Sequence, residues 1–244
     1  MTDFTIMLCG IAIGVHSMFE ATRDFCSEYL TDRPPKFELT VTPNDLEAER
    51  QSLQKSDIYE GREAVNYRDE DLERTALLRL AADKLPEYDA LLFHGAIVAF
   101  EGKCYMFTAP SGTGKTTHSL LWLKNIPHSY ILNGDKPFLL SKEGEIYGCA
   151  SPWQGKEDYG VNEILPLAGI CLLERADFNH IEKISYDSAF EALVLQSHKP
   201  AKTPALLNYM KLLSRFSKVA LYRLGCNTED EAALVCYKKM TENI

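Results

Sequence analysis

Residues 103–121 read KCYMFTAPSGTGKTTHSLL, and this stretch decides the fold that we expect for the chain. The fixed positions of a phosphate-binding loop are held by Ala109, Gly114, Lys115 and Thr116. Phosphate is densely charged and needs several donors that converge from one side. A turn poor in side chains lets the N–H groups of 111–116 point inward, and the helix that follows adds the partial positive charge of its N-terminus. In this pattern Lys115 contacts the terminal phosphates, and the Thr116 hydroxyl completes the shell of a Mg²⁺ ion.

A phosphate-binding loop needs a strand before it and a helix after it. The apolar run 104–108 predicts the strand, and residues 115–124 have helical spacing that Pro127 ends. The pattern usually opens with glycine, whereas this chain has Ala109, which fits if its φ is negative. The predicted nucleotide contacts are Ala109, Pro110, Ser111, Gly112, Thr113, Gly114, Lys115, Thr116 and Thr117.

The composition is that of an ordinary globular protein, with 45% hydrophobic residues in a chain of 244. The formal net charge of −9 argues against nucleic acid or an anionic membrane as the main partner, because neither would gain from counterion release. The seven cysteines show no zinc or disulfide spacing, so we expect reduced thiols and a cytoplasmic protein. The apolar run 4–15 is too short to span a bilayer and lacks the positive segment of a signal peptide.

We expect a small N-terminal α/β portion over residues 1–88. Its strands are predicted over 4–9 and 37–41, and its helices from a capping box at Ser17 and Glu20 to about 30, from Pro43 onward, and over 71–84. Residues 51–70 are polar without a clear period, which favours a surface loop or hairpin. A shift in composition at Pro86 marks the start of a second, phosphate-binding portion over 89–244.

The second portion opens with a near-continuous apolar run at 91–98, which predicts one strand buried on both faces. His94 lies inside that run, either as a hydrogen-bonded core residue or as an active-site group. Residues 130–133 predict another buried strand, which ends at Gly134 and Asp135. An acidic residue at the carboxyl end of such a strand, 20 positions after Lys115, is where these proteins hold Mg²⁺, so we assign Asp135 to the metal rather than to a simple turn.

The remaining segments alternate between strands and helices. Loop 151–162 contains Trp153 and Lys156, and it is either a cover over the ligand or a surface turn with Trp153 inside. Further elements are predicted as a hairpin at 138–141 and 145–148, strands at 167–173 and 218–224, and helices at 187–197, 204–216 and up to about 240.

Three segments together resemble a known kinase core. His94-Gly95, the string SGTGKTT at 111–117 and Asn133-Gly134-Asp135 are similar to the core shared by HPr kinase/phosphorylase and the ATP-dependent phosphoenolpyruvate carboxykinases. Small bacterial HPr-kinase-like proteins are more similar still, and the resemblance covers roughly residues 90–165. It implies an α/β fold with a mixed central sheet flanked by helices, ATP and Mg²⁺ as the donor, and phosphoryl transfer to a hydroxyl.

By motif position the resemblance gives catalytic roles to Lys115, Asp135 and His94, and it places Thr116 and Asp135 on Mg²⁺. This chain has Gly134 where those kinases have the first of two adjacent aspartates. Two carboxylates can divide metal binding from proton transfer. With one carboxylate, either Asp135 holds the metal while His94, Asp158 or Glu174 takes the proton, or turnover is weak or lost.

Two functional hypotheses follow. The first is an ATP-dependent kinase whose acceptor is a serine of a protein or peptide, or a small alcohol. The second is a nucleotide-binding regulatory module with little turnover. Decarboxylation is not expected, because the sequence has neither the long substrate domain nor the Lys/His metal set of a carboxykinase. The sequence does not name the acceptor, and an oligomer is compatible with it.

Overall fold

The computed structural model describes residues 2–59, 61, 63, 65–155, 159–200 and 203–242. The chain divides into two compact units, Met1–Ala82 and Asp83–Ile244. This division falls shortly before the boundary at 88 and 89 that composition favours. Among the described residues, no helix combines the length and apolar character needed to cross a membrane.

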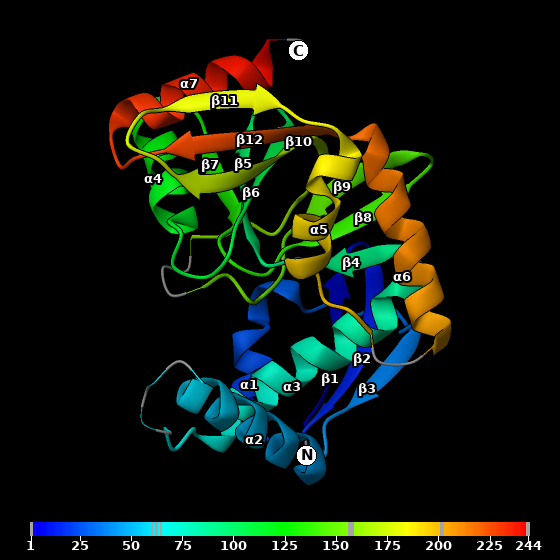
Figure 1. The fold of residues 1–244 in the computed structure, drawn as a ribbon. Helices are drawn as coiled ribbons and strands as arrows, with labels where there is room; N and C mark the ends of the chain where they lie inside the picture. The colour runs from blue at the N-terminus through cyan, green and yellow to red at the C-terminus, as the bar shows by residue number, and fades with distance from the viewer. Residues whose placement is uncertain are drawn as a thin grey trace. The chain divides into compact units, whose positions relative to one another are not determined.

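The first unit is built on a three-stranded sheet in the order β1-β2-β3 (Figure 1). β1 (Thr2–Leu8) and β2 (Ile11–Ser17) form an antiparallel hairpin, and β3 (Phe37–Thr40) pairs with β2 in parallel. Cys9 and Gly10 make the turn, with φ of 53° and 75°. The sequence predicts the first and third strands but not the second.

Three helices complete the first unit: α1 (Glu20–Phe25), α2 (Pro43–Tyr59) and α3 (Asp69–Lys84), the last ending just past the unit boundary. The predicted capping box at Ser17 and Glu20 is wrong, because no side chain of α1's own segment caps the helix. The fully buried carboxylate of Glu73 accepts hydrogen bonds from the Met18 and Phe19 amides, at 2.5 and 3.2 Å, and from the Thr22 hydroxyl. The helix start is therefore capped from a distant part of the chain.

Helix α2 corrects the prediction of a loop over 51–70, since it continues to Tyr59. Its polar residues are held by side-chain bonds rather than by an apolar stripe. Gln51 donates to Glu47 one turn earlier at 2.8 Å, and the buried Asp57 accepts from the Tyr67 hydroxyl at 2.8 Å. Hydrophobic periodicity does not detect a helix stabilised in this way.

The second unit contains a mixed sheet with nine strands among the described residues. Its main path runs β4-β8-β9-β10-β6-β5-β7, and β12 joins β10 to β11 (Figure 1). The bounds are β4 (Ala90–Leu92), β5 (Gly95–Phe100), β6 (Lys103–Thr108), β7 (Tyr130–Asn133), β8 (Phe138–Lys142), β9 (Glu145–Cys149), β10 (Ile164–Arg175), β11 (His180–Lys183) and β12 (Ala220–Cys226). This arrangement agrees with the expected mixed α/β fold.

The predicted single strand over 91–98 is two strands. β4 pairs with β8, whereas β5 pairs with β6 and β7, and the chain breaks between them at Phe93 and His94. The His94 amide donates to the Gln196 carbonyl at 2.7 Å, and the Thr108 hydroxyl donates to the His94 carbonyl at 2.7 Å. These bonds fix His94 at the end of the sheet next to the end of β6.

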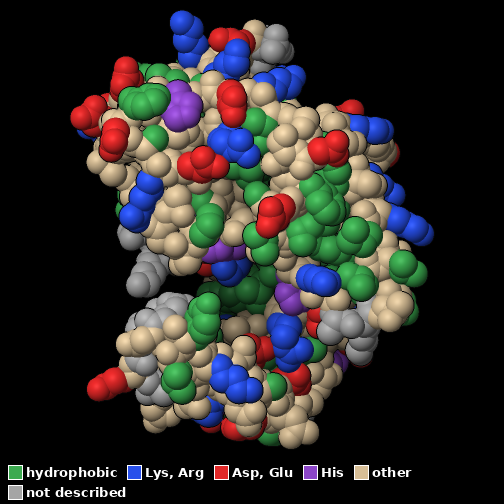
Figure 2. All heavy atoms as spheres, viewed as in Figure 1, with side chains coloured by type: hydrophobic (Ala, Val, Ile, Leu, Met, Phe, Trp, Pro, Cys, Tyr) green, Lys and Arg blue, Asp and Glu red, His purple; other side chains and the backbone are tan. Residues whose placement is uncertain are grey.

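Helices α4 (Lys115–Asn125) and α7 (Asp230–Thr241) pack against each other and cover one face of this sheet. Their apolar side chains form a core with β6, β10 and β12, and Trp122 is completely buried in it. Helices α5 (Tyr186–Leu195) and α6 (Thr203–Arg215) lie over the other part of the sheet, near β4 and β8 (Figure 1). Figure 2 shows apolar side chains gathered on the surface of these two helices.

Candidate functional site

The segment between β6 and α4 is a turn that two glycines make possible. Gly112 has a φ of 75° and Gly114 a φ of 122°, conformations that L side chains rarely adopt. Ala109 does not have a positive φ, so alanine is accommodated at the first position of the motif. Gly114 is the N-cap of α4 and no side chain caps this helix, so the N–H groups of its first turn are left for another partner.

This turn forms one wall of a cavity of about 480 Å³. The described residues around the cavity are His94, Ala96, Ser111, Gly112, Gly114, Lys115, Thr116, Thr117, Ser119, Ile131, Gly134, Asp135, Gln154, Gly155 and Tyr159. The structure thus brings His94 and Asp135 to the same cavity as six of the nine predicted loop contacts. Ala109, Pro110 and Thr113 do not line it.

Lys115 holds the turn together from inside. Its ammonium group donates to the carbonyl oxygens of Ala109 and Pro110, at 2.8 and 3.3 Å, and the side chain is only 8% exposed. Burial lowers the pKa of Lys115, the nearby Asp135 raises it and Lys136 lowers it. An ammonium group has three donors, so one remains for a ligand in the cavity.

Asp135 follows β7 in a turn that Asn133 fixes. The Asn133 side-chain oxygen accepts hydrogen bonds from the amides of Asp135 and Lys136, at 3.0 and 2.8 Å, and Asn133 is completely buried. Oδ1 of Asp135 lies 3.4 Å from Nζ of Lys136 and 3.4 Å from Nε2 of His94. The carboxylate is therefore held between a cation and an imidazole at the cavity wall.

His94 is uncharged at neutral pH. Burial, together with the charges of Lys136 and Lys115, lowers its pKa from 6.5 to about 4, although Asp135 acts in the opposite direction. A neutral imidazole has one nitrogen with a lone pair and can take a proton. His94 therefore has the protonation state of a base.

Steric crowding explains why residue 134 is a glycine. A Cβ added at this position would lie 2.5 Å from the carbonyl oxygen of Gln154, a distance that real Cβ atoms do not show. Gly155, which follows Gln154, also lies close to the Asp135 turn. A Cβ added at Gly155 would lie 3.3 Å from Cβ of Asp135. The main chain of the 151–155 segment thus occupies the space that a second acid would need.

The loop predicted either to cover a ligand or to form a surface turn has features of both. Trp153 is 9% exposed and packs inside, while Gln154, Gly155 and Tyr159 line the cavity. Asn133 donates from its side chain to the Ser151 carbonyl at 3.0 Å, which attaches this loop to the end of β7. Lys156 and Asp158 lie outside the described residues.

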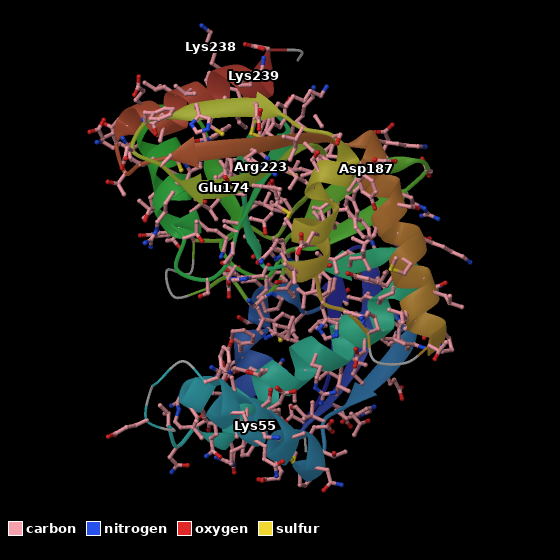
Figure 3. All side chains as sticks on the ribbon, in the orientation of Figure 1. Lys55, Glu174, Asp187, Arg223, Lys238 and Lys239 are labelled. Atoms are coloured by element: carbon pink, nitrogen blue, oxygen red, sulfur yellow. The ribbon has the colours of Figure 1, made fainter. Side chains whose placement is uncertain are left out.

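Glu174, a candidate base in the sequence, does not line this cavity. It is on β10 and pairs with Arg223 of the neighbouring strand β12, at 3.0 Å (Figure 3). Residues alternate between the two faces of a strand, and Glu174 lies on the face opposite its neighbours Leu173 and Arg175. Of the candidate bases that the structure describes, His94 is thus the one in the cavity.

Sequence reasoning gave no role to several residues of the site. Lys136 carries a charge that acts on both His94 and Lys115, and Gln154 and Tyr159 line the cavity. Lys136 could have been found because it directly follows Asp135. Gln154 had no signal of its own within a loop of mixed polarity.

The residues of the cavity fit a magnesium ion. Mg²⁺ is usually bound by one or two carboxylates together with substrate phosphates and water. Asp135 supplies one carboxylate and Thr116 one hydroxyl on the same cavity. Among the described residues, no group of three or more His, Cys, Asp and Glu side chains is arranged to hold a metal without such a substrate.

No model of a protein family matches the chain, and no curated protein matches it either. Among solved structures, the Hpr(Ser) kinase/phosphatase from Coxiella burnetii is similar, with 11% identity, a TM-score of 0.35, and coverage of 62% of this chain and 94% of that one. At this level of similarity, the likeness bears on neither activity nor substrate.

Proposed function

We propose that this chain is an ATP-dependent kinase that transfers a phosphoryl group to a hydroxyl. The observation that carries the proposal is the single cavity shared by the 111–117 turn, Asp135 and His94. Its donors come from backbone N–H groups and one buried ammonium, which is the chemistry that a triphosphate needs. Its one carboxylate and one hydroxyl suit a divalent ion.

The roles follow from position. Ser111, Gly112 and the first turn of α4 hold the phosphate chain, and Lys115 neutralises charge on the terminal phosphates. Thr116 and Asp135 would hold Mg²⁺, which supplies a charge that offsets that of the phosphate oxygens. Lys136, 3.4 Å from Asp135, adds a second cation next to this carboxylate.

In the transfer step, the bond between the terminal phosphorus and the ADP oxygen breaks, and a bond to the acceptor oxygen forms. The acceptor's hydroxyl proton passes to His94. Its low pKa makes His94 a weak base, but the loose transition state of phosphoryl transfer needs little help from a base. A bound triphosphate would also offset the charges of Lys115 and Lys136, which raises the pKa of His94 toward a more effective range.

The proposal is tested with purified protein, ATP and Mg²⁺, first alone and then with cell extract as a source of acceptors, by measuring ADP and phosphorylated species. Lys115→Ala should reduce turnover by about 100-fold, because it removes a donor aimed at the transferring group. Lys124→Ala is the matched control, since Lys124 is an exposed lysine of the same helix that pairs with Asp230.

Two results would count against the kinase. If ATP binds through Lys115 but no ADP appears above the Lys115→Ala background in any extract, the regulatory module is the better description. If Lys115→Ala and Lys124→Ala bind ATP as the wild type does, the cavity is not a triphosphate site. Gly134→Asp would not simply add the second carboxylate that the related kinases have, because the Gln154 carbonyl fills the space that its side chain would need.

A further inference from the structure

A second cavity, of about 360 Å³, lies on the other side of the phosphate-loop turn. It is lined by Gly112, Thr113, Gly114, Thr117, His118, Leu173, Arg175, Ala176, Cys226, Asn227 and Thr228. Gly112, Gly114 and Thr117 line both cavities. A molecule whose phosphates lie along this turn can therefore extend into either cavity.

The two cavities differ in chemistry. The first contains Lys115, Asp135 and His94, whereas the second has a wall of Leu173, Ala176 and Cys226 at the carboxyl ends of β10 and β12. An apolar wall with a few fixed polar groups is typical of a site for an organic ligand. Its volume is also within the range of such sites, about 300–1,000 Å³.

Arg175 is held in place at this cavity. Its Nη2 donates to the carbonyl oxygen of Gly112, at 2.5 Å, which ties the end of β10 to the phosphate-loop turn. A guanidinium group is planar and stacks on flat aromatic systems such as nucleobases. Arg175 thus offers both a contact to the turn and a surface for a base.

One ring nitrogen of His118 has no hydrogen-bond partner at the same place. It is 2% exposed and lines the cavity, and its Nδ1 has no partner. Trp122 donates its indole N–H to Nε2 of His118 at 3.2 Å, so Nε2 carries the lone pair and the ring proton is on Nδ1. The thiols of Cys226 and Cys236 lie beside this ring, and the ring nitrogens and hydroxyls of a nucleoside would bring stronger acceptors to this end of the cavity.

We propose that this second cavity holds the base and ribose of the nucleotide, so that a bound nucleoside triphosphate covers the Cys226 thiol and modification of Cys226 excludes the nucleotide. The proposal rests on the proposed function and extends it to the nucleoside and to control by thiol chemistry. Cys226 is suited to report on it, because it is partly exposed while the other six cysteines are buried.

The first experiment needs no variant. The protein reacts with iodoacetamide, in which the Cys226 sulfur displaces iodide and forms a thioether while the thiol proton goes to solvent, and mass spectrometry follows the rate at Cys226. Mg·ATP should slow this reaction at least about tenfold, a protection worth about 1.4 kcal/mol or more. Mg·tripolyphosphate, which has the phosphates without the nucleoside, should leave the rate within about twofold of that of the free protein.

The second experiment is the converse. Alkylated protein should bind ATP at least about tenfold more weakly than untreated protein and bind tripolyphosphate with unchanged affinity. The affinity of Cys226→Ser for ATP, whatever its value before treatment, should not change on treatment with iodoacetamide. This variant separates the effect at Cys226 from any effect at a buried cysteine.

The outcomes are distinguishable. If tripolyphosphate protects Cys226 as well as ATP does, or if alkylated protein still binds ATP normally, the nucleoside does not occupy this cavity and the inference is wrong while the triphosphate site stands. If neither compound binds in a Lys115-dependent way, the proposed function fails, and this inference fails with it.

Discussion

The two units of this protein both bury charged side chains, but they bind them differently. In the first unit, the carboxylate of Glu73 is fully buried and accepts hydrogen bonds from two amides and a hydroxyl. In the second unit, Lys115, Asp135 and His94 face a cavity, and the contacts of Asp135 Oδ1 with Nε2 of His94 and Nζ of Lys136 are both long, at 3.4 Å. A buried charge with complete bonding stabilises the fold, whereas one that keeps bonding capacity toward a cavity is available to a ligand.

The largest expected effect concerns Glu73, whose buried carboxylate accepts three hydrogen bonds. Glu73→Ala should lower the free energy of unfolding by about 4 kcal/mol, because it removes three hydrogen bonds to a charged acceptor and leaves two amides of the α1 start without a partner. Chemical denaturation measures this loss. Glu70→Ala on the same helix is the control, at about 1 kcal/mol or less. Equal losses in the two variants would show that the hydrogen bonds of the buried Glu73 carboxylate do not stabilise the fold.

The low pKa of His94 leads to a prediction about how the stability of the protein depends on pH. The pKa of His94 is about 4 in the folded protein and 6.5 in the unfolded chain, so between these values the unfolded chain binds a proton that the folded protein does not. The contribution of His94 to the free energy of unfolding should be fully present above pH 6.5. It should decrease as the pH falls toward 4, by at most about 3 kcal/mol, since each pKa unit corresponds to about 1.4 kcal/mol.

Denaturation curves at a series of pH values test the role of His94. His94→Asn should flatten the pH dependence over this range, because it removes the titrating group, whereas His128→Asn at an exposed turn should leave it as it is. A wild-type profile that does not change between pH 6.5 and 4 would show that His94 is not held uncharged by its surroundings.

A smaller effect is expected at the contact between the Asp135 turn and the 151–155 segment. Gly134→Ala should cost about 2 kcal/mol, because its Cβ collides with the Gln154 carbonyl. The displacement should also change the fluorescence of Trp153, which is adjacent to Gln154. Gly144→Ala is the control, since Gly144 has a φ of 88° and open space around it, so that it reports backbone strain without a collision.

The smallest effect is expected at Glu174. Its ion pair with Arg223 is partly exposed, and Glu174→Gln should change the free energy of unfolding by about 0.5 kcal/mol or less and leave turnover unchanged. A loss of turnover with ATP and an acceptor would show that Glu174, rather than His94, takes the proton. It would also show that a group outside the cavity takes part in the reaction.

Apolar runs and turn residues were enough to predict most of the second unit, including β6, α4 and β7. The sequence did not predict the break at Phe93, because the apolar run continues through it and the separation depends on hydrogen bonds to Gln196 and Thr108. It also missed the second half of α2, where polar side chains bond to one another.

In the candidate site, too, the sequence predicted local patterns but not contacts between distant segments. The phosphate-loop motif and the acid after β7 are local patterns, and the sequence predicted that their residues act together. The reason for Gly134 is not local, because it depends on a carbonyl 20 residues further along the chain, at Gln154. The second cavity is likewise assembled from three segments, around residues 112–118, 173–176 and 226–228, and no single one of them carries a pattern.

Strand β10 has a consequence for the order in which the protein matures. Its start pairs with β9, while its later part pairs with β6, the strand that carries the phosphate-loop turn, through partners such as Leu167 and Cys104. Pairing across such a sequence separation forms slowly. During synthesis, β6 gains this neighbour only after β10 has left the ribosome, so the proposed nucleotide site would be incomplete in a nascent chain that ends before Ile164.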